Sequence, residues 1–210
     1  MSLGAADAAA LERCVAGGGV AVFPADTVYG LCCDPDDAAA AERIYEMKGR
    51  PPARPAAVMF FTLTGALAEL DDLAPHERSA VEALMPGPVT LLLANPARRY
   101  APACGPDPET LGLRVPALGL HAAALQAVAR PVLQTSANDS GGADAARLAD
   151  VPARIRDAAD LVLDGGTLGG LPSTVIDLRA GRGRWQILRA GALPERAVEE
   201  ALGERTIGGR

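Results

Sequence analysis

Short apolar runs alternate with helical patterns along most of this chain, with glycine and proline between them. Such alternation is typical of α/β proteins, in which helices cover the faces of a buried sheet. The predicted strands are Val20–Phe23, Ala57–Phe61, Val89–Ala94, Leu111–Val115, Val132–Thr135, Leu161–Leu163, Ser173–Leu178 and Arg184–Leu188. The predicted helices are 5–16, a helix from a cap at Asp36 or Asp37 to about Lys48, Pro75–Leu84, His121–Ala129, a helix from a cap at Asp150 to 159, and Pro194–Leu202. We therefore expect an α/β fold with a twisted, mixed sheet.

A length of 210 residues suits one domain. We place this domain at 5–202, with a C-terminal tail at 203–210. The apolar runs are too short to cross a bilayer, and the first residues lack the basic and apolar regions of a signal peptide. We therefore expect a cytoplasmic protein without membrane contact. The net charge of −6 argues against a general nucleic-acid-binding surface, so at most a weak RNA contact is expected.

The four cysteines, at positions 14, 32, 33 and 104, form no metal-binding pattern. None is spaced as C-x-x-C, and adjacent Cys32 and Cys33 cannot easily share a tetrahedral zinc. Only two histidines are present, and both fall outside the polar motifs described below. We expect free thiols and no metal ion bound by the cysteines.

Four segments beside the predicted strands are rich in polar residues. They are PADTVYGL (24–31), KGRPPARP (48–55), TSAND (135–139), and LPSTVIDL (171–178) together with ILRAG (187–191). Each alone is compatible with an ordinary turn, cap or solvated loop. Together they matter more, because ligands of α/β proteins usually bind in the loops beyond the strand ends.

The segment at 48–55 contains three cations, and one of them is unusual. Lys48 is the only lysine among the 20 basic residues of a chain that otherwise uses arginine. Cations, hydroxyls and an amide together suit a polyphosphate and an accompanying Mg²⁺. Neither G-x-x-x-x-G-K-[ST] nor a strand-linked G-x-G-x-x-G is present, so side chains from separate loops would have to hold a nucleotide. We expect Lys48 to be exposed in such a pocket and to contribute little to stability.

The motifs PADTVYGL, KGRP, PGPVTLLL, LRVP, TSAN, STVIDL and ILRAG occur in this order, between about residues 10 and 195. The ordered set resembles the YrdC-like family of threonylcarbamoyl-AMP synthases. The resemblance implies a twisted open sheet with a large concave pocket. It also implies formation of threonylcarbamoyl-AMP and pyrophosphate from L-threonine, bicarbonate and ATP, the last with Mg²⁺. The product would pass to a tRNA threonylcarbamoyl transferase machinery for threonylcarbamoyladenosine modification of tRNA.

The resemblance also implies roles for individual residues. The residues implied to be catalytic, through ATP phosphates, are Lys48, Arg50, Ser136 and Asn138. The further residues implied to bind ATP are Arg54, Thr110, Asp144 and Arg189. The residues implied to bind threonine are Thr27, Tyr29, Arg114, Gln134 and Ser173, with Arg114 on the carboxylate. Family members often have Asn where this chain has Arg54 and His where it has Met59. The threonine contact of that histidine is therefore not implied for Met59.

The implied chemistry needs no covalent nucleophile. The threonine amine would capture carbon dioxide or bicarbonate, and the resulting carboxylate would attack the α-phosphorus of ATP, so catalysis would rest on positioning and electrostatics. Two alternatives remain: an RNA-binding member of the same fold without synthase activity, and a carbamoyl-handling enzyme. The acidic composition and the complete Lys-Arg-Ser-Asn set favour the synthase over RNA binding.

Overall fold

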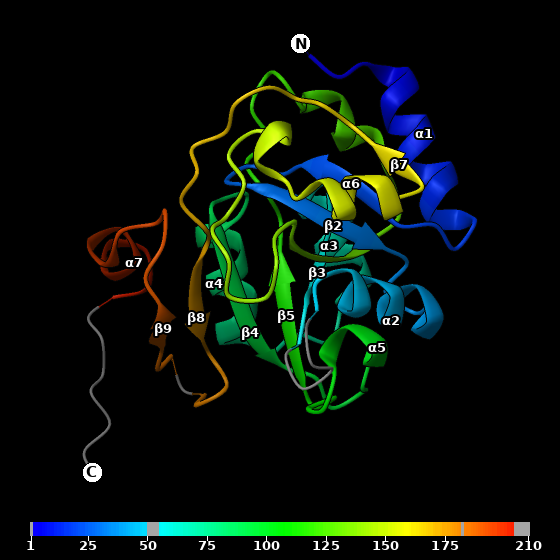
Figure 1. Cartoon of the computed structure of the whole chain (residues 1–210). Helices are drawn as coiled ribbons and strands as arrows, with labels where there is room; N and C mark the ends of the chain where they lie inside the picture. The colour runs from blue at the N-terminus through cyan, green and yellow to red at the C-terminus, as the bar shows by residue number, and fades with distance from the viewer. Residues whose placement is uncertain (1, 50–54, 182, 204–210) are drawn as a thin grey trace.

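A computed structural model describes residues 2–49, 55–181 and 183–203, and within them nine strands form one sheet. The strands are β1 (Ala21–Pro24), β2 (Tyr29–Cys33), β3 (Ala57–Met59), β4 (Val89–Ala94), β5 (Thr110–Arg114), β6 (Val132–Ser136), β7 (Leu161–Val162), β8 (Thr174–Asp177) and β9 (Gln186–Arg189). Their order is β7-β1-β2-β6-β3-β5-β4-β8-β9. The pairs β1 with β7, β3 with β5 and β4 with β8 are parallel, and the other neighbouring pairs of this sheet are antiparallel. The sheet is mixed, as predicted, and so strongly twisted that β1 and β2 run across the direction of β4 and β5 (Figure 1).

Helices cover both faces of this sheet. They are α1 (Ala5–Ala16), α2 (Ala38–Met47), α3 (Leu63–Glu69), α4 (Pro75–Leu84), α5 (Ala101–Cys104), α6 (Ala153–Ala158) and α7 (Glu195–Leu202), with 3₁₀ turns η1 (Ala123–Ala127) and η2 (Leu148–Asp150). One buried cluster joins Ile44 of α2 and Val81 of α4 to Leu113 of β5. The other joins Leu11 of α1 and Leu125 of η1 to the opposite face. No helix in the described ranges is long and apolar enough to cross a membrane.

Several predicted elements match the structure closely. The helices at 5–16 and Pro75–Leu84 and the strand Val89–Ala94 have the predicted bounds. Asp37 caps α2, since its carboxylate accepts from the backbone N–H groups of Ala39 and Ala40. The predicted tail at 203–210 lies outside the described residues except for Gly203.

Other predicted elements were wrong. The segment before Cys33 is not a loop: Tyr29–Cys33 forms β2, which pairs with β1 after a tight turn. The predicted helix His121–Ala129 is only the 3₁₀ turn Ala123–Ala127. Asp150 does not cap α6, because its carboxylate accepts from the backbone N–H of Arg147, within η2. The helix α3 was not predicted; its cap is Thr62, whose hydroxyl accepts from the N–H of Gly65.

Candidate functional site

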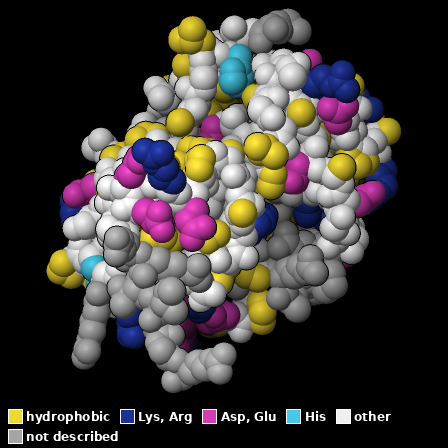
Figure 2. Space-filling model, turned by 90° about the vertical axis from the view of Figure 1, so that its left-hand side faces the viewer, with side chains coloured by type: hydrophobic (Ala, Val, Ile, Leu, Met, Phe, Trp, Pro, Cys, Tyr) yellow, Lys and Arg dark blue, Asp and Glu magenta, His cyan; other side chains and the backbone are white. Residues whose placement is uncertain are grey.

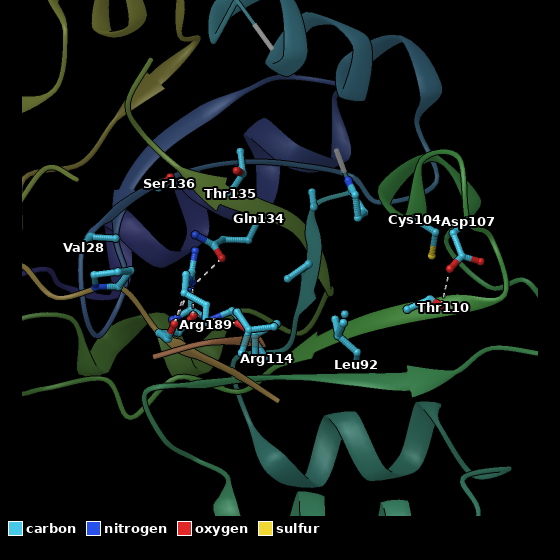
Figure 3. A pocket seen from close by; sticks show the side chains of 18 of the residues that line it. Val28, Leu92, Cys104, Asp107, Thr110, Arg114, Gln134, Thr135, Ser136 and Arg189 are labelled. Carbon is cyan, nitrogen blue, oxygen red and sulfur yellow. Dashed lines mark hydrogen bonds between the residues drawn. The ribbon is translucent and has the colours of Figure 1, made fainter. Parts of the chain in front are cut away.

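A pocket of about 510 Å³ opens over the central strands, from β6 to β8 (Figure 3). It lies on the same sheet face as α1, because Gln134 in its floor is in register with Cys32, which packs beneath α1. The lining residues are Val28, Pro55, Ala56, Ala57, Thr90, Leu92, Cys104, Pro106, Asp107, Thr110, Gly112, Arg114, Gln134, Thr135, Ser136, Asp144, Pro172, Ser173, Val175, Arg179 and Arg189. The candidate site is therefore the part of this sheet face that the pocket exposes.

Its two ends differ in composition. At one end Arg114, Gln134 and Arg189 point towards one another from β5, β6 and β9 (Figure 3). We call these residues, with Ser173, the Arg114 end. Cys104, Asp107 and Thr110 lie at the opposite end, and with Arg179 they form the Thr110 end (Figure 3). Figure 2, viewed from the side of β9 and α7, shows a hollow in the molecular surface with Lys or Arg side chains inside it.

Arg114 is held in a buried ion pair. Its Nη2 donates to Asp26 Oδ1 at 2.7 Å and its Nη1 to Gln134 Oε1 at 2.9 Å. The side chains of Arg114 and Asp26 are only 5% and 4% exposed. Burial lowers the pKa of the Arg114 guanidinium, while the carboxylate of Asp26 opposes that shift. The predicted site residue Arg114 is therefore in the pocket, but it already has a protein carboxylate as its partner.

Gln134 reaches this position because β2 has a glycine beside it. A Cβ at Gly30 would lie 2.7 Å from Gln134 Nε2 and 3.2 Å from the carbonyl oxygen of Thr135. Only glycine leaves room for the amide there. The glycine of the PADTVYGL motif thus serves the pocket through β6 rather than through its own turn.

Ser173 and Arg189 hold one another at the Arg114 end. Arg189 Nη2 donates to the carbonyl oxygen of Ser173 at 2.8 Å and to its Oγ at 3.1 Å. The Ser173 hydroxyl also lies 2.9 Å from Thr90 Oγ1. The two predicted residues therefore meet in the pocket, although 16 positions separate them in sequence.

Ser136, Asn138 and Asp144 form a connected polar group above β6. Ser136 Oγ donates to Asn138 Oδ1 at 2.7 Å, and Asn138 Nδ2 donates to Asp144 Oδ1 at 3.3 Å. Of these, Ser136 and Asp144 line the pocket. We call Ser136–Asn138 the SAN segment.

Lys48, which follows α2, is not exposed, contrary to prediction. It is 3% exposed, and its Nζ donates to the carbonyl oxygen of Asn138 at 2.8 Å and to Asn138 Oδ1 at 2.9 Å. A third bond reaches the carbonyl oxygen of Ser136. The ammonium group is buried because the SAN segment supplies these oxygens in place of water. Lys48 therefore ties the end of α2 to the polar group beside the pocket.

The Thr110 end contains a network that the sequence did not indicate. Arg179 binds both carboxylate oxygens of Asp177, at 2.9 Å and 2.8 Å. Its Nη1 also donates to Thr110 Oγ1 at 2.6 Å, and Thr110 donates to Asp107 Oδ2 at 2.6 Å. Thr110 was predicted, whereas Arg179 and Asp107 were missed. The available signal was weak: an arginine two residues after the aspartate that ends the STVID strand.

Two predicted threonine-binding residues lie elsewhere. Tyr29 is fully buried, and its hydroxyl donates to Asp164 Oδ1 at 3.0 Å and to the carbonyl oxygen of Gly166 at 2.8 Å. Burial raises its pKa to about 12. Thr27 is 4% exposed, and its buried hydroxyl has no partner among the described residues. Neither side chain is among those that line the pocket.

Three further residues differ from the family pattern or belong to the KGRPPARP motif: Met59, Arg50 and Arg54. Met59 is fully buried in β3, in register with Arg114. Arg50 and Arg54 lie outside the described residues.

The ionisable groups described in the pocket favour binding over covalent chemistry. Burial raises the pKa of Cys104 to about 11, so its thiol is protonated at neutral pH and is a poor nucleophile. Three arginines line the pocket, and each donates a hydrogen bond to a neighbouring hydroxyl or amide that also lines it. Such an arrangement suits a ligand with several anionic groups.

Comparisons with known proteins agree with this geometry. Residues 13–191 match the family model Sua5_yciO_yrdC, which is described as "Telomere recombination". The chain is 36% identical over 186 residues to a threonylcarbamoyl-AMP synthase of Xanthomonas euvesicatoria, covering 85% of this chain and 96% of that protein. It is 30% identical to a threonylcarbamoyl-AMP synthase of Pyrococcus abyssi, covering 90% of this chain but only 55% of that protein.

A solved structure is similar over almost the whole chain. The structure of P. abyssi Sua5 complexed with L-threonine aligns with a TM-score of 0.80 at 28% identity. The alignment covers 98% of this chain and 60% of that one. The predicted twisted mixed sheet is thus found in a known protein that binds an amino acid.

Proposed function

Because the chain belongs to the Sua5/YciO/YrdC family, we propose that it is an L-threonylcarbamoyladenylate synthase. Its substrates are L-threonine, bicarbonate and ATP, and its products are threonylcarbamoyl-AMP and pyrophosphate. The observation that carries this proposal is one pocket of about 510 Å³ with an arginine-rich amino-acid end and a separate hydroxyl- and carboxylate-rich end. That volume lies in the range of pockets for small ligands and cofactors.

Threonine occupies the Arg114 end. Its carboxylate binds Arg114, and Gln134 and Ser173 surround the rest of the amino acid. The nucleotide extends towards Thr110, and Arg189 lies between the two substrates. A threonine methyl group that packs on the pocket wall contributes about 1 kcal/mol over serine.

The reaction joins the two substrates without a covalent enzyme intermediate. The threonine amine adds to carbon dioxide and releases a proton, or condenses with bicarbonate and releases water, to give an N-carboxylate. One oxygen of this group attacks the α-phosphorus of ATP, and the bond to the β-phosphate breaks to release pyrophosphate. The chain supplies fixed donors for the charge that moves onto the phosphate oxygens.

Mg²⁺ bound together with ATP would neutralise phosphate charge. The half-buried carboxylate of Asp144 and the hydroxyl of Ser136 are oxygen ligands of the kind this ion prefers, and both line the pocket. The product passes to a tRNA threonylcarbamoyl transferase machinery.

The test is incubation of the protein with ATP, Mg²⁺, L-threonine and radiolabelled bicarbonate. We expect label in threonylcarbamoyl-AMP and an equal amount of pyrophosphate. In a parallel incubation with labelled carbamoyl phosphate in place of bicarbonate, consumption of the label would indicate the carbamoyl-handling alternative. RNA binding without product would indicate a binding module, which the net charge of −6 does not favour.

A further inference from the structure

Asp26 is buried beside the pocket without lining it. It lies in the turn between β1 and β2, where the N–H of Ala25 donates to the carbonyl oxygen of Val28 at 3.3 Å. The N–H of Gly170 donates to the carbonyl oxygen of Thr27 at 2.9 Å, which ties the turn to a distant loop. Asp26 is not among the described residues that line the pocket, whereas its partner Arg114 is. Its second carboxylate oxygen accepts from the backbone N–H of Ala117 at 3.4 Å, so the shorter bond to Arg114 is the main route by which Asp26 can affect a ligand.

The guanidinium of Arg114 is only partly used by the protein. Its two terminal nitrogens donate to Asp26 at 2.7 Å and to Gln134 at 2.9 Å. Its Nε is buried and has no partner among the described residues. A guanidinium carries five N–H donors and binds a carboxylate best through two parallel bonds. The two bonds use two of these five donors, so one N–H on each terminal nitrogen and the Nε–H are left for a ligand.

We propose that Asp26 is a positioning residue, which fixes the plane of Arg114 so that its remaining N–H donors are presented to the carboxylate of the amino-acid substrate. This inference rests on the proposed function, because it concerns the same amino-acid end of the pocket. Because Asp26 and Gln134 each accept a hydrogen bond from one terminal nitrogen, the guanidinium cannot rotate. Without Asp26, the plane would be fixed by Gln134 alone.

The buried charge explains why a carboxylate is used for this purpose. Arg114 is 5% exposed and also experiences the positive charge of Arg189. A buried cation without a counter-charge is strongly disfavoured. Asp26 supplies that counter-charge before the substrate arrives, so Arg114 is placed and oriented in the free protein.

The test compares two ligands that differ only in the carboxylate: L-threonine and L-threoninamide. Dissociation constants are measured by calorimetry for the wild type and for Asp26→Asn, which removes the charge but keeps the shape. We expect Asp26→Asn to weaken threonine at least about tenfold and threoninamide less than about twofold. In turnover assays the KM for threonine should rise by a similar factor, while the KM for ATP stays unchanged.

Glu77→Gln is the matched control. Glu77 is a buried carboxylate, 3% exposed, that accepts from the N–H groups of Ala94 and Ala74 away from the pocket. This variant should lose stability without changing the ratio of the two dissociation constants. Asp26→Glu keeps the charge but displaces it by one methylene, and it should weaken threonine by about threefold.

Equal weakening of both ligands, or an unchanged ratio in a folded Asp26→Asn variant, would overturn the proposal. So would a wild type that does not distinguish threonine from threoninamide, or failure of both Asp26 variants to fold. The proposed function fails separately, when the wild type binds threonine but forms no labelled threonylcarbamoyl-AMP.

Discussion

Lys48 has its ammonium group among three oxygens of the SAN segment, and this environment fits an ammonium better than a guanidinium. A planar guanidinium is larger and needs a wider approach to its acceptors. We predict that Lys48→Arg lowers the rate of product formation at least about tenfold, or ~1.4 kcal/mol of transition-state stabilisation. Pyrophosphate release at saturating substrates measures the effect.

The same substitution should also lower the melting temperature, because Lys48 is 3% exposed rather than open to solvent. Arg196→Lys is the control, since the Arg196 side chain is 88% exposed in α7 and pairs with Glu200 on the same helix. It should leave turnover and melting temperature unchanged. Wild-type turnover in folded Lys48→Arg would show that the identity of this cation is unimportant.

Arg114 provides a second prediction for a single residue. Arg114→Ala removes the donor for the substrate carboxylate and leaves the buried carboxylate of Asp26 without its cation. We expect the binding free energy of threonine to weaken by about 3 kcal/mol or more and that of ATP to change much less. Calorimetric titration with each substrate separates the two effects. Equal losses of affinity for the two substrates would mean that Arg114 binds the phosphates or stabilises the fold.

Between elements, Gly191 decides how closely the chain after β9 approaches the start of β8. A Cβ at this position would lie 2.3 Å from the carbonyl oxygen of Pro172 and 2.5 Å from the carbonyl carbon of Ser173. These are backbone atoms, so Gly191→Ala must push the two segments apart and displace Ser173 and Arg189. We predict a loss of unfolding free energy of about 1–3 kcal/mol and weaker binding of threonine.

Urea unfolding and calorimetry measure both effects. Gly169→Ala is the matched control, because a Cβ there meets nothing within 4 Å. Its stability should stay within about 0.5 kcal/mol of the wild type. A Gly191→Ala protein that unfolds at the wild-type urea concentration would mean that the segments can separate at no cost.

At the scale of the whole molecule, the pocket spans strands from β6 to β8 near the middle of one continuous sheet. Ligands that bind only the folded chain stabilise it by about 2.7 kcal/mol at 100 times their dissociation constant. We predict that threonine and ATP with Mg²⁺ each raise the melting temperature, and that serine raises it less than threonine. Scanning calorimetry tests this; a melting temperature unmoved by either substrate would argue against both ligands.

Elements with strong local signals were predictable. Proline begins α4 and Met85-Pro86 follows its end, so this helix is bounded by residues that the neighbouring sequence contains. By contrast, Tyr29–Cys33 is buried on both faces and pairs with β6, about a hundred residues away. A short buried strand has no alternation of polar and apolar residues, so nothing local distinguishes it from a loop.

The sequence by itself determined the fold class, most strands and helices, and the set of polar motifs from which the pocket residues Arg114, Gln134, Ser136 and Ser173 could be named. Only the tertiary structure decided the partners of those residues. Arg114 and Asp26 are 88 positions apart, and Lys48 and Asn138 are 90 apart. Arg179 and Thr110 are 69 apart. Residue patterns report on neighbours within a helix or strand, whereas these contacts follow from the order of strands in the sheet and from the cost of burying an unpaired charge.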